Sequence, residues 1–360
     1  MKIGILTYHR SDNFGALFQA IASRKFFESL GHEAYHIDYW PEYHKAMYAP
    51  FSWWLFWRKG LKDKYVYLRM SLMKYSESKE RRKKYTKFVE KYIEPYCAPD
   101  GLVFDTIFYG SDQIWRKQPY IDAYNPVYFA HNNYKAKRHV ALSASAGILP
   151  NSQEDIACFK SLLDRFDCIS VREQSLKDLI EDLGYKATLT CDPALFLTAE
   201  KWNEVFPEKV VKKKSYLLLV NYIEESFNKG AVKKLAKTMG LDYVCINGSV
   251  IHNSENEDLN NVAPLELFDY IRNAEFVCTS SFHALVFSLI YHKQCLASFK
   301  QNAKRAESLL DELGIRRRLL EPGVSYLNNN DPIDYCMVSK KMAIFREVSL
   351  EYITTSLMHE

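Results

Sequence analysis

The stretch KIGILTYHRSDNFGALFQAIASRKFFESLGHEAYHIDYW (2–40) decides the fold expected for this chain. It opens with an apolar run, 2–9, whose residue types are typical of a strand. An amphipathic segment follows and ends at Gly31, the residue type that most often closes a helix. Residues 34–40 return to a strand pattern. This order predicts a βαβ unit in a parallel sheet with a right-handed crossover.

The same alternation of short apolar strands and helical segments continues along most of the chain. It predicts an α/β protein made of two Rossmann-like, doubly wound domains that face a cleft. The first domain is expected at 1–198, with a helical insertion at about 41–100, and the second at 199–333. Residues 334–360 are expected to form a helix that packs back on the first domain.

Composition narrows the class of protein. The chain has 360 residues, of which 48% are hydrophobic and 26% are charged, as in ordinary globular proteins. A formal net charge of +4 gives no indication of nucleic-acid binding. None of the eight cysteines forms a CxxC pair, which favours reduced thiols over disulfides or zinc. The start lacks a signal-peptide pattern and no apolar run is long enough to span a membrane, so a cytoplasmic location is expected.

The insertion at 41–100 has a different composition from its surroundings. FSWWLFWRKG (51–60) is aromatic and basic, and a strongly charged helical segment follows. The charged residues are expected to form a solvated helix face. The tryptophans are expected to pack inside a helical hairpin. The alternative is contact with a membrane interface or a lipid-linked substrate.

A histidine stands at a strand–helix junction in CTSSFHALVFSLIYHK (278–293). The apolar spacing predicts a helix that begins near Phe282, with Ser280 or Ser281 as its N-cap. His283 then lies in the first turn, where amide groups and the helix dipole attract anions. It could contact and protonate an anionic substrate, or it could be an ordinary capping or surface residue.

Two further residues follow strands. Arg172, in CISVREQS (168–175), could clamp a phosphate or carboxylate; a salt bridge with Glu173 or another neighbour is the alternative. In YGSDQIW (109–115), Ser111 or Asp112 could cap a helix that begins near Gln113. Asp112 could also orient or deprotonate a sugar hydroxyl.

Other polar positions are weaker candidates. The loop RSDNFGALFQ (10–19) carries neither GxGxxG nor a P-loop, but Asp12 and Asn13 could contact an acceptor. Asp192 could face the cleft. The basic residues Lys300, Lys304 and Arg305 are expected to be mostly solvated, although one of them could reach a phosphate. No HxH, HExxH or DxD spacing occurs where ligands would need to converge, so no metal is expected. No cofactor is expected either.

Taken in order, seven stretches resemble the polysaccharide pyruvyl transferase family. They are SDNFGALFQA, YGSDQIW, VALSASAG, SVREQSLKDLI, DPALF, CTSSFHALVFSLIYHK and AKRAESLLDELGI. The resemblance runs from residue 1 to about 320 and lapses mainly in 41–100. It implies a fold similar to the glycosyltransferase-B architecture. It also implies a transferase that moves a pyruvyl group from phosphoenolpyruvate onto two hydroxyls of a sugar in a surface or exopolysaccharide, with release of phosphate.

The resemblance also implies roles for particular residues. Arg172 and His283 are expected to help hold the phosphoenolpyruvate. Ala284 stands where the family usually has glycine, and Ser280 and Ser281 stand where many members carry arginine or aspartate.

A mechanism follows as a hypothesis. His283 and Asp112 are the expected catalytic residues. Ser281, Phe282 and Lys304 are expected to complete the donor site together with Arg172 and His283. Asp12, Asn13 and Asp112 are expected at the acceptor.

The expected partners are phosphoenolpyruvate and a saccharide acceptor, either free or lipid-linked. Membrane contact would be peripheral at most, at the inner face. Two alternatives stay open: a nucleotide-sugar glycosyltransferase of the same fold, and a non-catalytic sugar-binding relative.

Overall fold

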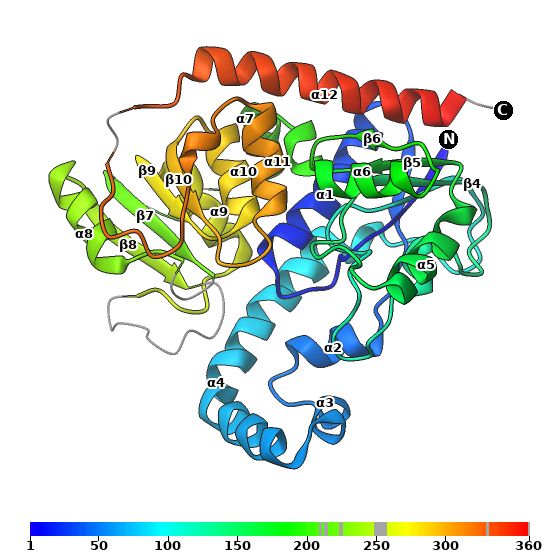
Figure 1. Ribbon diagram of the computed structural model, residues 1–360, viewed down its shortest axis with the longest axis horizontal. Helices are drawn as coiled ribbons and strands as arrows, with labels where there is room; N and C mark the ends of the chain where they lie inside the picture. The colour runs from blue at the N-terminus through cyan, green and yellow to red at the C-terminus, as the bar shows by residue number, and fades with distance from the viewer. Residues whose placement is uncertain (209–210, 212–214, 223–225, 248–257, 329–330, 359–360) are drawn as a thin grey trace. The chain divides into compact units, whose positions relative to one another are not determined.

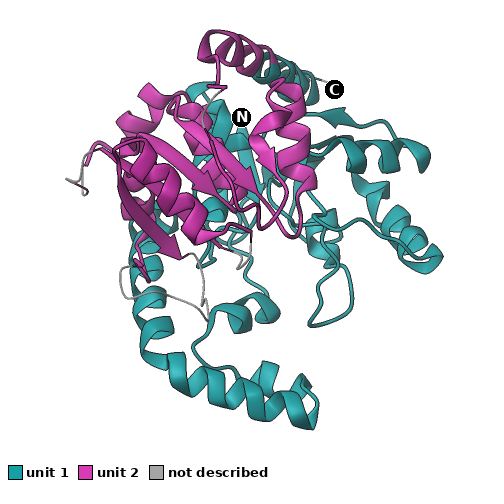
Figure 2. Ribbon diagram, turned by 60° about the vertical axis from the view of Figure 1, so that its left-hand side comes forward, with its two compact units in different colours: residues 1–196, 345–360 teal, residues 197–344 magenta. Residues whose placement is uncertain are grey.

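The computed structural model divides into two compact units. It describes residues 1–208, 211, 215–222, 226–247, 258–328 and 331–358. The first unit comprises residues 1–196 together with 345–360, and the second comprises 197–344 (Figure 2). The boundary expected near residue 198 stands two residues from this division. Each unit is described by itself.

The first unit is built on a six-stranded parallel sheet in the order β2-β1-β3-β4-β5-β6 (Figure 1). Its strands are β1 (Lys2–Leu6), β2 (Glu33–His36), β3 (Phe104–Tyr109), β4 (Ala136–Ala144), β5 (Cys168–Val171) and β6 (Thr188–Leu189). Helix α1 (Phe14–Ser29) connects β1 to β2, which pair in parallel with Ile3 opposite Ala34. The βαβ unit predicted from 2–40 is therefore confirmed.

Helices and short 3-10 turns connect these strands. The segment between β2 and β3 forms α2 (Glu42–Tyr48), α3 (Trp53–Arg58), α4 (Leu61–Tyr92) and η1 (Glu94–Tyr96). The later connections contain η2 (Pro126–Phe129), α5 (Gln153–Leu162), η3 (Leu163–Arg165), α6 (Gln174–Asp182) and η4 (Pro193–Phe196).

Aromatic side chains pack on both faces of this sheet. On one face, Phe27 of α1 lies against Phe108 of β3, with ring centroids 4.6 Å apart. A second cluster stacks Trp115 on Phe129 at 5.2 Å and sets Phe159 edge-on to both rings. Such pairs stabilise a core beyond the area they bury.

The end of helix α12 (Tyr335–Met358) also belongs to the first unit. The Tyr352 hydroxyl donates to the carbonyl of Ala141 in β4 at 2.8 Å. The Cys191 amide, which follows β6, donates to Ser349 Oγ at 2.9 Å. The last turns of the chain therefore satisfy backbone groups of the first unit.

The second unit contains a five-stranded parallel sheet in the order β11-β10-β9-β7-β8. Its strands are β7 (Tyr216–Asn221), β8 (Asp242–Asn247), β9 (Phe276–Thr279), β10 (Gln294–Ser298) and β11 (Leu319–Leu320). Its helices are α7 (Ala199–Val205), α8 (Lys229–Thr238), α9 (Pro264–Asn273), α10 (Phe282–Ile290), α11 (Lys304–Glu312) and the 3-10 turn η5 (Arg316–Arg318). Trp202 packs on Phe287 of α10 with ring centroids 5.1 Å apart.

Both sheets change their direction of growth after the second strand. The switch lies between β1 and β3 in the first unit and between β7 and β9 in the second. The expected fold class of two doubly wound α/β domains is therefore confirmed. Ligands of such sheets bind outside the carboxyl ends of the strands at these switch points, which directs attention to the loops after β1, β3, β7 and β9.

Two expectations about the whole chain can be compared with the structure. Each of the eight cysteines lies in a described segment and is a free thiol. Within the described segments, none of the helices combines the length and the apolar character needed to traverse a bilayer.

Candidate functional site

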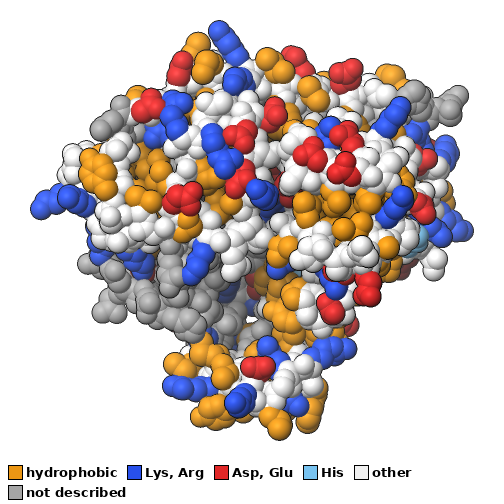
Figure 3. Space-filling view, in the orientation of Figure 1, with side chains coloured by type: hydrophobic (Ala, Val, Ile, Leu, Met, Phe, Trp, Pro, Cys, Tyr) orange, Lys and Arg blue, Asp and Glu red, His pale blue; other side chains and the backbone are white. Residues whose placement is uncertain are grey.

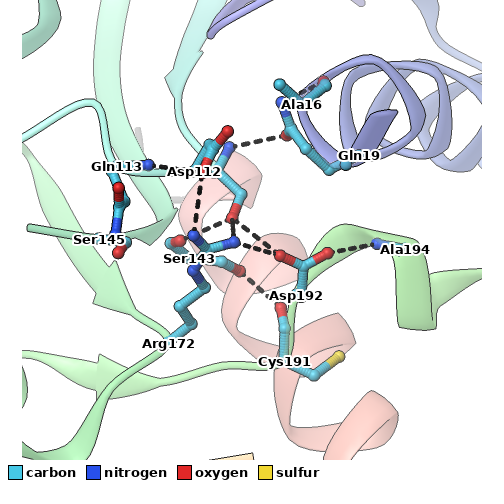
Figure 4. A network of polar contacts seen from close by, with 12 residues as sticks. Ala16, Gln19, Asp112, Gln113, Ser143, Ser145, Arg172, Cys191, Asp192 and Ala194 are labelled. Carbon is cyan, nitrogen blue, oxygen red and sulfur yellow. Dashed lines mark hydrogen bonds and ion pairs between the residues drawn. The ribbon is translucent and has the colours of Figure 1, made fainter. Parts of the chain in front are cut away.

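Arg172 stands at the carboxyl end of β5, inside a buried network of polar contacts (Figure 4). Its guanidinium donates to Asp112 Oδ1 at 3.2 Å and to Ser111 Oγ at 3.2 Å, and it forms an ion pair with Asp192. Only 1% of the Arg172 side chain is exposed. Burial lowers the pKa of Arg172, but Asp192 and Asp112 outweigh this effect and raise it, so the guanidinium stays charged.

The salt-bridge alternative considered for Arg172 is therefore present, with Asp192 and Asp112 as its partners. Buried charges of opposite sign stabilise each other only as a complete set, because one uncompensated ion costs several kcal/mol. The arrangement holds the Asp112 carboxylate in one place. Direct binding of the donor by Arg172 stays a prediction.

The loop that carries Asp112 is fixed from three sides. The Thr7 hydroxyl donates to the carbonyl of Ser111 at 2.9 Å, and the Ser111 amide donates to Gln19 Oε1 at 3.2 Å. A side chain on Gly110 would place its Cβ 2.1 Å from the carbonyl oxygen of Leu142, so only glycine fits there. The loop is thus bonded to the segment after β1 and to α1, and it packs closely on β4.

The prediction of a helix that begins near Gln113 is wrong. Residues 111–116 are all described, and they form bends and turns. Asp112 adopts a left-handed backbone with φ 70°, and its own side chain accepts from the Gln113 amide at 2.9 Å. This local bond caps a turn and opposes continuation into a helix.

Tyr8, in the loop after β1, forms an aromatic group with His44 and Tyr48 of α2, and the charge of Asp112 acts on all three side chains. Tyr8 and His44 lie with ring centroids 4.5 Å apart, and His44 and Tyr48 lie 5.2 Å apart. Burial, with the Asp112 charge as a further cause, raises the pKa of both Tyr8 and Tyr48. Burial lowers the pKa of His44 to about 3, partly offset by the Asp112 charge. The Asp112 charge therefore acts on two phenols and an imidazole that burial keeps neutral.

Sequence analysis did not find this aromatic group. His44 and Tyr48 belong to the segment treated as an insertion, and only the packing of α2 brings them to Asp112. Gln19 and the pair Ser145 and Glu173, in which the serine hydroxyl donates to the carboxylate, were missed as well. Ser145 and Glu173 share one usable signal, because Ser145 directly follows β4 and Glu173 is the second residue after β5.

Asp12 and Asn13 lie in the loop after β1. Asp12 is buried and pairs with Arg82 of α4, with Oδ1 and Nη1 2.5 Å apart, while Arg81 donates to its backbone carbonyl at 2.9 Å. Asn13 caps α1, since its Oδ1 accepts from the Gly15 amide at 3.0 Å. Burial raises the pKa of Asp12 against the opposing effect of Arg82. Both residues have structural roles, and their contact with an acceptor stays a prediction.

His283 belongs to the second unit, in the first turn of α10 after β9. Ser281 is the N-cap, and its Oγ accepts from the Ala284 amide at 3.4 Å. Ser280 has a different role, since its Oγ accepts from the Tyr222 amide at 2.8 Å and so ties β9 to the end of β7. His283 itself is buried. The predicted helix start and its serine cap are thus confirmed.

The basic residues at the start of α11 divide between two environments. The Lys304 side chain is 64% exposed and pairs with Glu307 at 3.1 Å. The guanidinium carbon of Arg305 lies 5.1 Å from the ring centroid of Phe282, in the first turn of α10. Arg305 is therefore placed beside the turn that carries His283, whereas binding of the donor by Lys304 stays a prediction.

One cluster has the spacing of metal ligands. One ligand atom from each of His9, Asp38 and Cys97 lies within 4.8 Å of the others. Arg10 already donates to both carboxylate oxygens of Asp38, at 2.6 and 2.9 Å, and His9 Nε2 lies 3.2 Å from the same carboxylate. A cation would have to compete with this guanidinium, so the cluster is better described as an ion-paired network. The expectation that the protein uses no metal stays a prediction.

Comparison with known sequences gives one match. A family model described as polysaccharide pyruvyl transferase matches residues 13–298. No curated protein sequence matches the chain. The matched range contains Asp112, Arg172 and His283, and it ends before α11.

Several solved structures are similar in outline. UDP-GlcNAc 2-epimerase from Methanocaldococcus jannaschii, in complex with UDP-GlcNAc and UDP, is 10% identical, with 100% of this chain and 94% of that chain covered at a TM-score of 0.43. A glycosyltransferase from Rickettsia africae is 13% identical, with 99% and 95% covered at a TM-score of 0.42. UGT89C1 from Arabidopsis thaliana, complexed with UDP, is 8% identical, with 98% and 94% covered at a TM-score of 0.43.

Proposed function

This chain belongs to the polysaccharide pyruvyl transferase family, and on that premise we propose that it transfers a pyruvyl group from phosphoenolpyruvate to two hydroxyls of one sugar in a surface or exopolysaccharide. The observation that carries the proposal is the family match over residues 13–298, because it spans both groups of strand-end residues described above.

In the proposed reaction the donor binds at the first turn of α10. Phosphoenolpyruvate carries a phosphate and a carboxylate, and the amide groups of a helix N-terminus favour such anions. The Arg305 guanidinium beside Phe282 adds a positive charge to this turn. His283, in the same turn, is the proposed general acid.

The proposed acceptor contact is Asp112. Its carboxylate is held by Arg172, and its charge acts on the phenols of Tyr8 and Tyr48. A carboxylate can accept a hydrogen bond from a sugar hydroxyl and take its proton as the hydroxyl attacks. Tyrosine rings offer a flat surface for a sugar. Arg172 acts here as a positioning residue for Asp112.

The chemistry balances without an oxidant or a metal. His283 donates a proton to the methylene carbon of phosphoenolpyruvate, which becomes a methyl group. One sugar hydroxyl attacks the neighbouring carbon, the bond from that carbon to the phosphate oxygen breaks, and phosphate leaves. A second hydroxyl of the same sugar then closes the cyclic ketal. Of the two hydroxyl hydrogens, one replaces the proton of His283 and the other leaves with the phosphate.

The deciding experiment incubates the protein with phosphoenolpyruvate and a panel of oligosaccharides and polysaccharide repeat units. The expected result is a sugar product whose mass has increased by one ketal-linked pyruvate, together with one equivalent of phosphate. The same panel is offered with nucleotide sugars in place of phosphoenolpyruvate.

Two results would contradict the proposal. Glycosyl transfer from a nucleotide sugar, without reaction of phosphoenolpyruvate, would assign the chain to the glycosyltransferase alternative. Acceptor binding without turnover of either donor would assign it to the sugar-binding alternative. Thermal unfolding with each donor alone separates these cases, since a bound donor raises the midpoint.

A further inference from the structure

The long helix α4 has two different halves. Near its C-terminus, Phe88 stacks on Phe18 of α1 with ring centroids 5.5 Å apart, and Tyr85 and Val89 are buried. Its N-terminal half, together with α3, forms what we call the α3–α4 tip (residues 53–75). Of the 23 large apolar side chains exposed among the described residues, nine belong to this tip. Isolated exposed apolar residues are ordinary, but such a concentration indicates a binding surface.

The exposed residues of α4 share one face of the helix. Leu61, Tyr65, Leu68, Leu72 and Tyr75 are spaced by four, three, four and three residues, which aligns them along one side. Leu61 is 87% exposed, and the other four are exposed as well. On a different side of the helix, the Tyr67 hydroxyl accepts from the Ser52 amide at 2.8 Å. Helix α4 therefore uses its other side to hold the segment before α3 and leaves its apolar stripe to solvent.

Tryptophans of α3 extend this apolar surface. Trp53 and Trp57 are stacked with ring centroids 6.4 Å apart, and Trp57 is 67% exposed. The Lys64 ammonium lies 4.8 Å from the centre of the Trp57 ring and so links α3 to α4. In Figure 3, apolar and basic side chains gather at the lower end of the molecule, over α3 and the adjoining turns of α4.

The tip is also strongly basic. Residues 53–75 contain six lysines and arginines and one aspartate, a net charge of +5, whereas the whole chain carries +4. At about 100° per residue, Lys64 and Arg69 flank the apolar stripe, and Asp63 lies on the opposite side of the helix. Long basic side chains in this position can extend towards phosphate groups while the apolar stripe is buried.

We propose that the α3–α4 tip docks on the surface of a bilayer that contains anionic phospholipids. Trp and Tyr favour the boundary between water and lipid, the leucines can enter the acyl region, and the basic residues attract anionic headgroups. The stripe has a spacing that also fits a coiled coil. A second copy of this chain, however, would bring a second charge of +5 against the first. The lipid surface is the occupant whose charge complements the tip.

The test uses the full chain and sedimentation with vesicles of phosphatidylcholine alone or mixed with phosphatidylglycerol. We expect binding to the mixed vesicles that weakens as salt rises and is much lower on phosphatidylcholine alone. Leu61→Gln with Leu72→Gln should abolish this binding without changing the thermal unfolding midpoint, because both side chains are exposed.

A charge variant tests the second half of the proposal. Lys62→Gln, Lys64→Gln and Arg69→Gln together should weaken binding about 100-fold, since each basic residue near an anionic surface contributes about 1 kcal/mol. The matched control is Lys186→Gln, Lys201→Gln and Lys237→Gln, which removes the same charge from exposed positions outside the tip and should leave binding within about twofold.

Three results would overturn the proposal. They are failure of the wild-type chain to bind mixed vesicles, equal binding by wild type and both tip variants, and a lipid-free dimer in analytical ultracentrifugation that Leu61→Gln and Leu72→Gln dissociate. None of these readouts involves turnover, so the membrane proposal and the proposed reaction can fail independently of each other.

Discussion

The two sheets share the order of their first five strands, but the residues that follow those strands have different roles in the two units. In the first unit, the residue after β5 is an arginine buried between Asp112 and Asp192. In the second unit, the residues after β9 are two serines that bond to backbone amides and a histidine in the first turn of a helix. The same edge of the same kind of sheet therefore holds a compensated set of charges in one unit and a helix terminus suited to anions in the other.

This difference indicates separate roles for Arg172 and His283, which the sequence alone assigns to the same donor site. Arg172 and His283 both follow strands, and the family resemblance assigns both to the donor. In the structure the charge of Arg172 is balanced within the protein, so its removal should first change stability. His283 lies in the first turn of α10, and Arg305 lies beside the Phe282 ring of the same turn, so removal of His283 should first change the reaction. Substitutions at four residues of the two units follow, from the largest expected effect to the smallest.

The largest effect is expected for Arg172→Met. Without the guanidinium, the Asp112 and Asp192 carboxylates lose the charge that balances them, and breaking such a buried pair costs about 3–5 kcal/mol. Urea unfolding should show this decrease in the free energy of unfolding. Lys304→Met removes an exposed pair as the control and should cost about 0.5 kcal/mol or less. A small loss of stability together with a large loss of donor affinity would instead indicate that Arg172 binds the donor directly.

His283→Gln should lower the rate of pyruvyl transfer about 100-fold or more, because glutamine keeps a polar group but cannot donate a proton as an acid. The rate is measured from ketal product by mass spectrometry at saturating phosphoenolpyruvate. The free energy of unfolding serves as the control and should change far less than in Arg172→Met. Full activity in His283→Gln would exclude this residue as the proton donor.

The third test concerns acid and the aromatic group of the first unit. His44 has a pKa of about 3 in the folded protein and an ordinary value of about 6.5 when unfolded. As the pH falls below about 6.5, the His44 imidazole takes up a proton in the unfolded chain while it stays neutral in the folded protein. The free energy of unfolding therefore decreases below pH 6.5. By pH 5 this loss is about 2 kcal/mol.

His44→Phe should remove that part of the acid sensitivity, measured as the free energy of unfolding at pH 7 and pH 5. The exposed His292 provides the control, because His292→Phe leaves the Asp112 surroundings intact. An unchanged pH dependence in His44→Phe would mean that acid acts on other groups.

The smallest effect separates capping from anion binding in the second unit. Ser281→Ala should cost about 1 kcal/mol, since it removes the N-cap of α10. Ser281→Asp restores the cap and should unfold like wild type, but its carboxylate would repel an anionic donor and raise the KM for phosphoenolpyruvate. An unchanged KM in Ser281→Asp would show that the donor does not bind at the first turn of α10.

The comparison also shows what could be predicted from sequence. The βαβ unit at 2–40 and the serine cap of α10 depend on local periodicity and on capping chemistry, and both are confirmed. The helix near Gln113 is wrong because Asp112 bonds its own neighbour and because the loop is fixed by Gln19 and Thr7, which are distant in sequence.

The features that the sequence does not predict depend on contacts between residues that are far apart in the chain. Nothing near Arg172 in the sequence indicates that Asp112 and Asp192 lie on either side of it, about 60 and 20 residues away. The placement of His44 beside Asp112 depends on how α2 packs. Lys304 and Arg305 are adjacent and chemically similar, and only the position of Phe282 distinguishes them.

Helix α12 has a consequence for the order in which the protein is made. Residues 345–358 complete the first unit, where Ser349 accepts from the Cys191 amide and Tyr352 donates to Ala141. The ribosome synthesises these residues only after the whole second unit has been translated. The first sheet therefore leaves the ribosome with part of its surface uncovered. That surface is covered only after residues 345–358 have been synthesised. The first unit can therefore be completed only after the second unit has been translated.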